Sequence, residues 1–333
     1  MLPSLLSTPD SARPQAHLDV VTYHYIRDLP NTPFPRIKGL LAADFHRQLK
    51  TLVEAYEMAT LESAFAFLTG AYHPRRHLCL LTFDDGLREH YTDVTPLLAD
   101  LHVQGVFFLI TSCMEERRTA PVHMNHFLLA TMTFEDYRNR FVEQLQELSP
   151  GADGLARIDP EVARRTYPWD DIEVARFKRY FNFELDPGLR DQAVGNLFEK
   201  YVGGAAEFAQ QLYLNWTEAR EMQSAGMVLG GHTHRHRPLS ALAAAELRDD
   251  LNRCATLLES NVHPQTLWPF SYPYGRRDSY NDESVAELRR AGYHCGFSTE
   301  VGGNYPGADV FSVRRFDTKQ VPGGPALPHV TQS

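Results

Sequence analysis

Two short apolar runs, at residues 78–83 and 227–231, each lead directly into residues that can bind a metal ion, and this pairing constrains the fold most. The two motifs are Asp84-Asp85-Gly86 and His232-Thr233-His234-Arg235-His236. One carboxylate and two imidazoles four residues apart can hold a divalent ion, and the second carboxylate is then free to act as a base. Each motif alone is weak, since Asp-Asp-Gly is a common turn. Together they predict a hydrolytic metal site.

Strand-like and helical segments alternate along most of the 333 residues. The strand-like segments are short, apolar and without simple alternation, which is typical of strands covered on both faces. They span residues 20–25, 78–83, 105–110, 227–231, 266–272, 295–298 and 311–313. Apolar stripes predict helices near residues 45–56, 97–101, 239–258 and 284–291. This pattern predicts a parallel barrel or a doubly wound sheet, and periodicity does not choose between them.

A long segment, residues 113–214, separates the third strand-like run from the fourth. It is far longer than an ordinary connection between a strand and the next strand. Apolar residues at helical spacing predict helices near residues 134–145 and 189–201. We therefore expect a helical insertion packed over one side of the sheet. It either shapes substrate access or serves only packing or oligomerisation.

Composition limits the partners and the compartment. A net charge of −9 argues against nucleic acid or an anionic membrane surface as a partner. No apolar stretch approaches the roughly 20 residues that span a bilayer. Four cysteines without a Cys-x-x-Cys spacing indicate reduced, buried thiols and a cytoplasmic protein. Residues 1–18 and 319–333 are predicted to be a disordered lead-in and a flexible tail, which leaves residues 19–318 for the folded unit.

A third motif, Ser271-Tyr272-Pro273-Tyr274-Gly275, follows the fifth strand-like run. With Thr-Phe-Asp-Asp-Gly and the histidine motif, it makes the chain resemble the polysaccharide deacetylase family, whose members share a NodB-homology domain. Within that family, related to carbohydrate esterase family 4, the Tyr-Pro-Tyr-Gly form and a first-strand histidine are similar to the biofilm-polysaccharide deacetylases. The resemblance implies an incomplete, distorted (β/α)7 barrel. It also implies a metal-dependent hydrolase that removes an acyl group from an N-acylated sugar.

The resemblance assigns roles to residues at the strand ends. Asp85, His232 and His236 correspond to the ligands of a divalent ion, zinc by default, with cobalt, nickel or iron as alternatives. Asp84 corresponds to the general base. The backbone amide of Tyr274 corresponds to the group that stabilises the oxyanion.

Three more residues are expected to contact the substrate, namely Tyr272, Pro273 and His234. His234 lies between the two predicted histidine ligands. A solvent-facing position, or one beside the ligands, is the alternative for its side chain.

Two parts of the family's machinery depart from the pattern. The third motif has Ser271 where the family has the arginine that orients the base, and the late Leu-x-His motif appears only in the Pro- and Gly-rich tail, at residues 327–329. We therefore expect His24, at the end of the first strand, to protonate the leaving amine. Arg315 follows the last strand, and because a barrel's first and last strands can lie close together, we expect it to orient Asp84.

Other proton donors stay open. They are His234, His329 folded back over the barrel, and water, whereas His294 opens a strand and so belongs to the opposite face of a barrel. The predicted function is N-deacetylation of an amino sugar or saccharide intermediate. The alternatives are a deformylase or another small-molecule amidase on the same fold, and a carbohydrate-binding protein that has lost catalysis. The sugar and the oligomeric state stay open.

Overall fold

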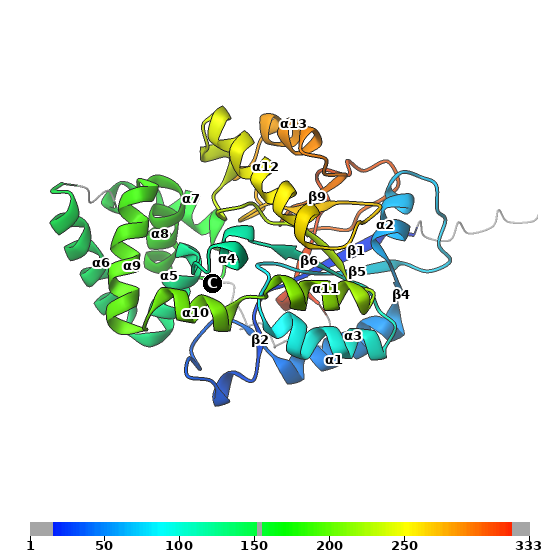
Figure 1. Cartoon of the computed structure of the whole chain (residues 1–333), viewed down its shortest axis with the longest axis horizontal. Helices are drawn as coiled ribbons and strands as arrows, with labels where there is room; N and C mark the ends of the chain where they lie inside the picture. The colour runs from blue at the N-terminus through cyan, green and yellow to red at the C-terminus, as the bar shows by residue number, and fades with distance from the viewer. Residues whose placement is uncertain (1–15, 152–154, 322–333) are drawn as a thin grey trace, which may run out of the picture.

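A parallel sheet forms the centre of the computed structural model, which describes residues 16–151 and 155–321 (Figure 1). Its strands are β1 (Leu18–Tyr23), β5 (Leu78–Phe83), β6 (Gly105–Leu109), β7 (Val228–Gly231), β8 (Pro269–Ser271), β9 (Cys295–Phe297) and β10 (Phe316–Asp317), with β4 (Glu57–Met58) paired to β5. The order across the sheet is β10-β1-β5-β6-β7-β8-β9. A separate parallel pair joins β2 (Ile26–Arg27) and β3 (Leu40–Leu41). The buried strands are apolar on both faces, because one face packs against helices and the other face packs against side chains of the other strands.

The last segment of the chain closes this sheet into an incomplete barrel. Val313 makes a parallel bridge to Phe297 of β9, and three residues later β10 pairs with β1. The residues from Val313 to Asp317 therefore cross from the last strand to the first. The predicted fold, an incomplete (β/α)7 barrel, is confirmed.

The predicted strand at residues 311–313 is wrong in position. The N–H of Phe311 donates to the side chain of Asp309, and the N–H of Ser312 donates to its carbonyl, so a local turn captures these groups. Only Val313 bridges a strand, and regular pairing begins at Phe316. Phe311 and Val313 are apolar because they are buried, and a buried residue need not belong to a strand.

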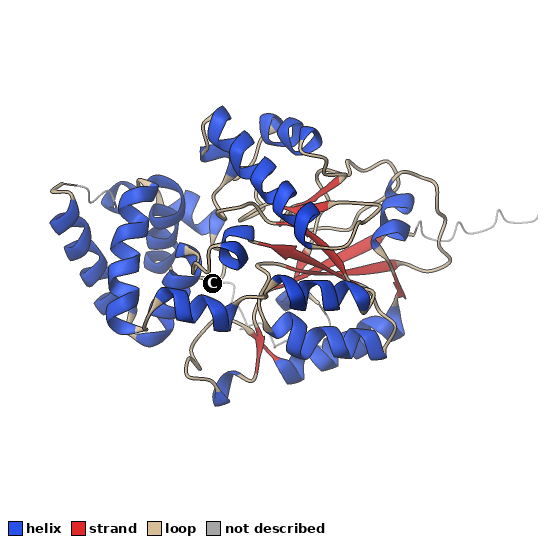
Figure 2. Cartoon of the chain, viewed as in Figure 1, coloured by secondary structure: helices blue, strands red, loops and turns tan. Residues whose placement is uncertain are grey.

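Helices of the barrel surround the sheet in Figure 2, where the strands are red. They are α1 (Ala42–Ala55), α2 (Leu61–Leu68), α3 (Thr95–Asp100), α11 (Trp216–Ser224), α12 (Ala244–Asn261) and α13 (Asp282–Arg290). The helix expected from residue 239 begins later, since Leu239–Ala241 forms a separate 3-10 turn and α12 starts where Glu246 caps the N–H of Ala243. Gly292, with φ +88°, follows α13 in the expected terminating position.

The segment between β6 and α11 is largely helical, and most of it lies beside the barrel (Figures 1 and 2). Its helices are α4 (Thr111–Glu115), α5 (Pro121–Thr131), α6 (Phe134–Leu148), α7 (Pro160–Thr166), α8 (Ile172–Arg179), α9 (Pro187–Tyr201) and α10 (Ala205–Leu212). The helices expected near 134–145 and 189–201 correspond to α6 and α9. We call α5 to α10, with their connections, the lobe.

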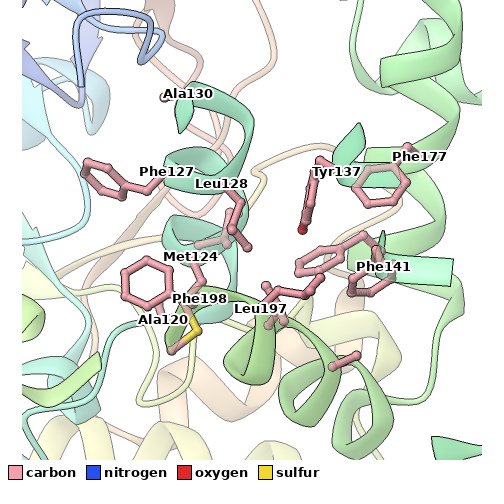
Figure 3. Packing of buried hydrophobic residues seen from close by; sticks show 14 of the residues in the cluster. Ala120, Met124, Phe127, Leu128, Ala130, Tyr137, Phe141, Phe177, Leu197 and Phe198 are labelled. Carbon is pink, nitrogen blue, oxygen red and sulfur yellow. The ribbon is translucent and has the colours of Figure 1, made fainter. Parts of the chain in front are cut away.

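Aromatic packing holds the lobe together (Figure 3). Phe141 of α6 and Phe177 of α8 are fully buried, with ring centroids 5.4 Å apart. Burial of each such side chain contributes about 1.5–3 kcal/mol. The same apolar cluster includes Leu87 and Ile110, which follow strands β5 and β6. The lobe therefore shares a core with the carboxyl ends of the barrel strands.

The ends of the described chain pack on the barrel. β1 starts at Leu18, so the end of the predicted lead-in is part of the fold, and Val321, in the predicted tail, is buried beyond the 3-10 turn Thr318–Gln320. The rest of both segments, including the Leu-Pro-His triplet, lies outside the described residues. All four cysteines are free and buried, as predicted. Within residues 16–151 and 155–321, no helix is long and apolar enough to cross a bilayer.

Candidate metal centre and active site

Three side chains from two strand ends converge on one point. Asp85 follows β5, whereas His232 and His236 follow β7, and their ligand atoms all lie within 4.8 Å of one another. The Nε2 atoms of both imidazoles lie 3.5 Å from Oδ1 of Asp85. All three residues are buried. The structure thus brings together the three residues that the sequence suggests as ligands. Their role as ligands stays a prediction.

The hydrogen bonds around these side chains fit a divalent ion. Nδ1 of His232 donates to the carbonyl oxygen of Ser271 at 2.7 Å, which leaves the lone pair of Nε2 free to face Asp85. Oδ1 of Asp85 is buried and has no hydrogen-bond partner among the residues that the structure describes. An unpaired buried carboxylate oxygen is costly unless a cation meets it. One carboxylate and two imidazoles are a common donor set for zinc and for similar metals.

The backbone of the site is strained at four non-glycine residues. Asp85, Thr233, His236 and Tyr274 have φ values of 79°, 64°, 54° and 63°. Such conformations cost about 1–3 kcal/mol each and persist where the surroundings fix them. Here the N–H of His236 donates to the hydroxyl of Thr233 at 2.7 Å, which holds the ligand turn. These four residues are two of the three candidate ligands, one residue between the two candidate histidine ligands, and one residue of the third motif.

Asp84 forms a buried, two-pronged ion pair with Arg315. Both guanidinium Nη atoms lie 2.8 Å from the two carboxylate oxygens, and neither side chain is more than 2% exposed. Burial by itself raises the pKa of Asp84, but the charge and hydrogen bonds of Arg315 outweigh it and lower the pKa to about 2. Asp84 is therefore ionised and fixed in orientation. This is the contact that the sequence predicted for Arg315.

The serine of the third motif makes this arrangement possible. Oγ of Ser271 donates to Asp84 at 3.1 Å and accepts from Nη2 of Arg315 at 3.0 Å. Nε of Arg315 also donates to the carbonyl of Ser298 at 2.8 Å. Because the segment from Val313 crosses from β9 to β1, it brings Arg315 beside the end of β5. A guanidinium from the last strand thus lies against the serine that replaces the family's arginine.

His24 lies beside the same carboxylate. It follows β1, its side chain is 47% exposed, and its Nε2 is 3.8 Å from Oδ2 of Asp84. The carbonyl oxygen of His24 accepts a hydrogen bond from Nε2 of His90 at 2.9 Å, which fixes the backbone there. His24 also lines the cavity over the site. Its predicted role as a proton donor stays a prediction.

The predicted substrate contacts differ in their placement. The ring of Tyr272 stacks on Tyr280 at 3.8 Å and its hydroxyl donates to the carbonyl of Phe311, so the hydroxyl is not directed at the site. His234 is buried, with Nδ1 3.0 Å from the Thr111 hydroxyl and Nε2 3.1 Å from a Glu116 oxygen. The hydrogen-bonding atoms of both side chains are therefore already used, but Tyr272 also lines the cavity over the site. The predicted substrate contacts of these two residues stay predictions.

Pro273 and Tyr274 form the turn beyond β8. Pro273 is buried within it. The ring of Tyr274 lies 5.2 Å from that of His236, and its hydroxyl donates to Asn182 of the lobe at 3.0 Å. The carbonyl oxygen of Tyr274 accepts from the Thr299 hydroxyl at 2.8 Å, which holds the turn from below. The third motif therefore links the candidate metal ligands to the lobe.

A cavity of about 510 Å³ opens over the site, and the lobe forms part of its wall. The barrel contributes His24, Asp84, Asp85, His232, His236, Tyr274 and Arg315. The lobe contributes Val122, His126, Tyr167, Trp169, Asp170, Lys178 and Asn182. Trp169 is 49% exposed, whereas Lys178 is buried and donates to Asp170 at 2.7 Å. Such a mixture of an aromatic face and fixed polar groups suits a polyhydroxylated ligand.

The lobe residues that line the cavity were missed by sequence reasoning, as was His123 of α5, which contacts a candidate metal ligand. Nε2 of His123 lies 3.0 Å from Oδ2 of Asp85, and the histidine side chain is fully buried. α5 is buried around most of its circumference, so its sequence carries no amphipathic stripe and no helix was predicted there. A pair of histidines three residues apart, His123 and His126, was the only available signal.

Comparison with known proteins agrees with this geometry. The family model for polysaccharide deacetylases matches residues 71–149 and 178–296, more than half of the chain. The chain belongs to the polysaccharide deacetylase family. The stretch between the two matched parts falls within the lobe and includes Tyr167, Trp169 and Asp170, which line the cavity.

Individual members of the family are distant relatives. YxkH of Bacillus subtilis (strain 168), provisionally assigned as a polysaccharide deacetylase, is 27% identical over 103 residues, which are 31% of this chain and 36% of that protein. The match thus spans about a third of the relative's length.

Solved structures share the fold along most of their length. Streptococcus pyogenes deacetylase PplD, in complex with acetate, superposes with a TM-score of 0.54 at 16% identity, over 91% of this chain and 92% of its own. The deacetylase domain of BpsB from Bordetella bronchiseptica superposes with a TM-score of 0.53 at 18% identity, over 90% of this chain and 95% of its own. IcaB from Ammonifex degensii superposes with a TM-score of 0.53 at 19% identity, over 90% of this chain and 94% of its own. At these identities the likeness establishes the fold.

Proposed function

We propose that this member of the polysaccharide deacetylase family is a metal-dependent hydrolase that removes an N-acetyl group from an amino sugar or a short saccharide. The observation that carries the proposal is the unpaired Oδ1 of Asp85 facing two imidazoles, beside a carboxylate that Arg315 holds ionised. All of these groups border one cavity. Asp85, His232 and His236 would hold the ion.

The bound ion, zinc or a metal of similar chemistry, would supply Lewis acidity that lowers the pKa of a water and polarises the amide carbonyl. Asp84 accepts the proton of the attacking water. With a pKa of about 2 it is a weak base, so it needs a water whose own pKa has been lowered. Arg315 and Ser271 keep the carboxylate in one orientation during this transfer.

Two further groups would complete the reaction. The backbone N–H of Tyr274, on its strained turn, would stabilise the oxyanion. His24 would protonate the leaving amine, supported by its place in the cavity and its exposure. His126 lines the same cavity, but burial, and then the charge of Lys178, lowers its pKa well below the ordinary value. A neutral imidazole is a poor acid, which favours His24.

The position of the lobe at the cavity is the reason to propose a small substrate. Residues of the lobe form part of the cavity wall, and Trp169 offers an exposed ring on which a sugar face can pack. A saccharide intermediate fits such a cavity better than the middle of a long polymer. The expected cytoplasmic location is part of the same proposal.

The test is acyl release from a panel of sugars. The purified chain, loaded in turn with zinc, cobalt, nickel or iron(II), is incubated with N-acetylated and N-formylated amino sugars, and acetate, formate and free amine are measured. We expect acetate in stoichiometric amount with amine, and formate alone would instead indicate the deformylase alternative. Sugar binding without release of either acid would indicate a binding protein and refute the proposal.

Asp84→Asn is the matched control for this assay. The amide is nearly isosteric but cannot accept the proton, so the variant should keep one metal ion per chain and lose nearly all turnover. Unchanged turnover would remove Asp84 from the role of base.

A further inference from the structure

The two oxygens of the Asp85 carboxylate have different surroundings. Oδ1 faces the Nε2 atoms of His232 and His236, each 3.5 Å away. Oδ2 lies 3.0 Å from Nε2 of His123, which reaches it from α5 of the lobe. The barrel thus supplies the partners of one oxygen, and the lobe supplies the partner of the other.

His123 is itself held by a buried tyrosine. Its Nδ1 is hydrogen-bonded to the hydroxyl of Tyr213, and the same phenol oxygen lies 3.1 Å from the backbone N–H of Ala120. Burial raises the pKa of Tyr213 well above its ordinary value, so the phenol keeps its proton. His123 and Tyr213 are both buried, away from bulk water.

The direction of each hydrogen bond follows from these partners. An ionised carboxylate only accepts, so Nε2 of His123 carries the proton and donates to Oδ2 of Asp85. In the tautomer that carries its proton on Nε2, Nδ1 accepts, and the hydroxyl of Tyr213 donates to it. The phenol oxygen in turn accepts from the N–H of Ala120. One arrangement of protons therefore satisfies the whole chain from Ala120 to Asp85.

We infer that His123, supported by Tyr213, is a positioning residue that fixes Asp85 so that Oδ1 alone is offered to the metal ion. This inference rests on the proposed metal site. A fixed carboxylate loses less rotational freedom when the ion binds, and the bond to Oδ2 favours coordination through one oxygen. Partners of this kind typically change metal affinity by about 10–100-fold.

The lobe is thereby part of the metal site. His123 lies in the first turn of α5, and α5 packs on α9 in the aromatic cluster that forms the lobe's core. Metal affinity should therefore depend on the order of the lobe. A buried histidine that serves only packing would affect stability equally with and without the ion, and this difference separates the two roles.

The experiment compares four variants by zinc affinity, measured in competition with a chromophoric chelator, and by melting temperature with and without zinc. His123→Phe removes the donor while keeping a ring, and it should weaken zinc binding by roughly 10–100-fold. His123→Gln keeps an N–H that can reach Oδ2, and it should recover part of the affinity. Tyr213→Phe should give a smaller loss of the same kind.

His126→Gln is the matched control, since His126 lies on the same helix with its Nδ1 directed at the hydroxyl of Tyr25. It should leave zinc affinity unchanged. In His123→Phe the increase in melting temperature on adding zinc should shrink.

Wild-type affinity in His123→Phe, or an equal fall of melting temperature with and without zinc, would overturn the inference while leaving the proposed function intact. If His123→Phe does not fold, His123→Gln and Tyr213→Phe decide the question, and wild-type zinc affinity in both would overturn it. Failure of the wild-type chain to bind zinc or another divalent ion would instead refute the proposed function.

Discussion

Replacing Arg315 by methionine should destabilise the protein and change how its stability depends on pH. Both side chains of the ion pair between Arg315 and Asp84 are buried, so the variant leaves a buried carboxylate without its cation. Loss of one partner of such a pair costs roughly 3–5 kcal/mol of unfolding free energy. The lowering of the Asp84 pKa from 3.8 to about 2 accounts for about 2 kcal/mol of this at neutral pH.

The sign of the pH effect follows from the two pKa values. In the wild type the folded-state pKa of Asp84 is the lower one, so its stabilisation is present above pH 3.8 and is lost as the pH falls through about 2. In Arg315→Met, burial is no longer outweighed, and the pKa should rise above 3.8. The difference in unfolding free energy between the wild type and the variant should therefore be largest near neutral pH and should become smaller as the pH approaches 2.

Urea unfolding at several pH values measures this difference. The acid limb of the pH profile of kcat/KM should also move to higher pH in Arg315→Met. Arg315→Lys keeps the positive charge but cannot donate two parallel hydrogen bonds, so its stability and its acid limb should lie between those of the wild type and Arg315→Met. Arg314→Met is the matched control, because this neighbouring side chain is exposed. A difference in unfolding free energy that is constant between pH 7 and pH 3, or an acid limb in the wild-type position, would refute the reasoning.

Two other variants test the remaining roles. His24→Ala should lower turnover by about 10²–10⁴-fold while metal content stays at the wild-type level, and near-normal rates across the pH range would make His24 structural. His232→Ala should abolish stoichiometric metal binding in a chain that stays folded, because the ligand lies above the core, and one ion per folded chain by elemental analysis would contradict its assignment.

The sequence predicted the position of reactive side chains where these follow the carboxyl end of a strand. Asp84, Asp85 and the ligand histidines come directly after apolar runs, and parallel strands bring their carboxyl ends to one edge, so their convergence could be predicted. Arg315 was predicted for the same reason, since the first and last strands of a barrel meet. These contacts depend on topology more than on side-chain detail.

The rest depended on tertiary packing that leaves no periodic signal. His123 lies on a helix buried around most of its circumference, so neither a stripe nor a motif marked it. Tyr272 and His234 belong to motifs at the site, yet their polar atoms are engaged by Phe311, Thr111 and Glu116, even though Tyr272 lines the cavity. Position in a motif indicated proximity, and it did not determine where a side chain points.

The crossing of the last segment from β9 to β1 has a consequence for the order in which the protein becomes active. The candidate ligands Asp85, His232 and His236 are all present once the first 236 residues have been made, so an unfinished chain already carries the residues of the proposed metal site. The guanidinium that fixes Asp84 arrives only with Arg315, when the first and last strands join. In the proposed mechanism, hydrolysis therefore requires that the last segment has joined the first strand, and turnover would report closure of the barrel.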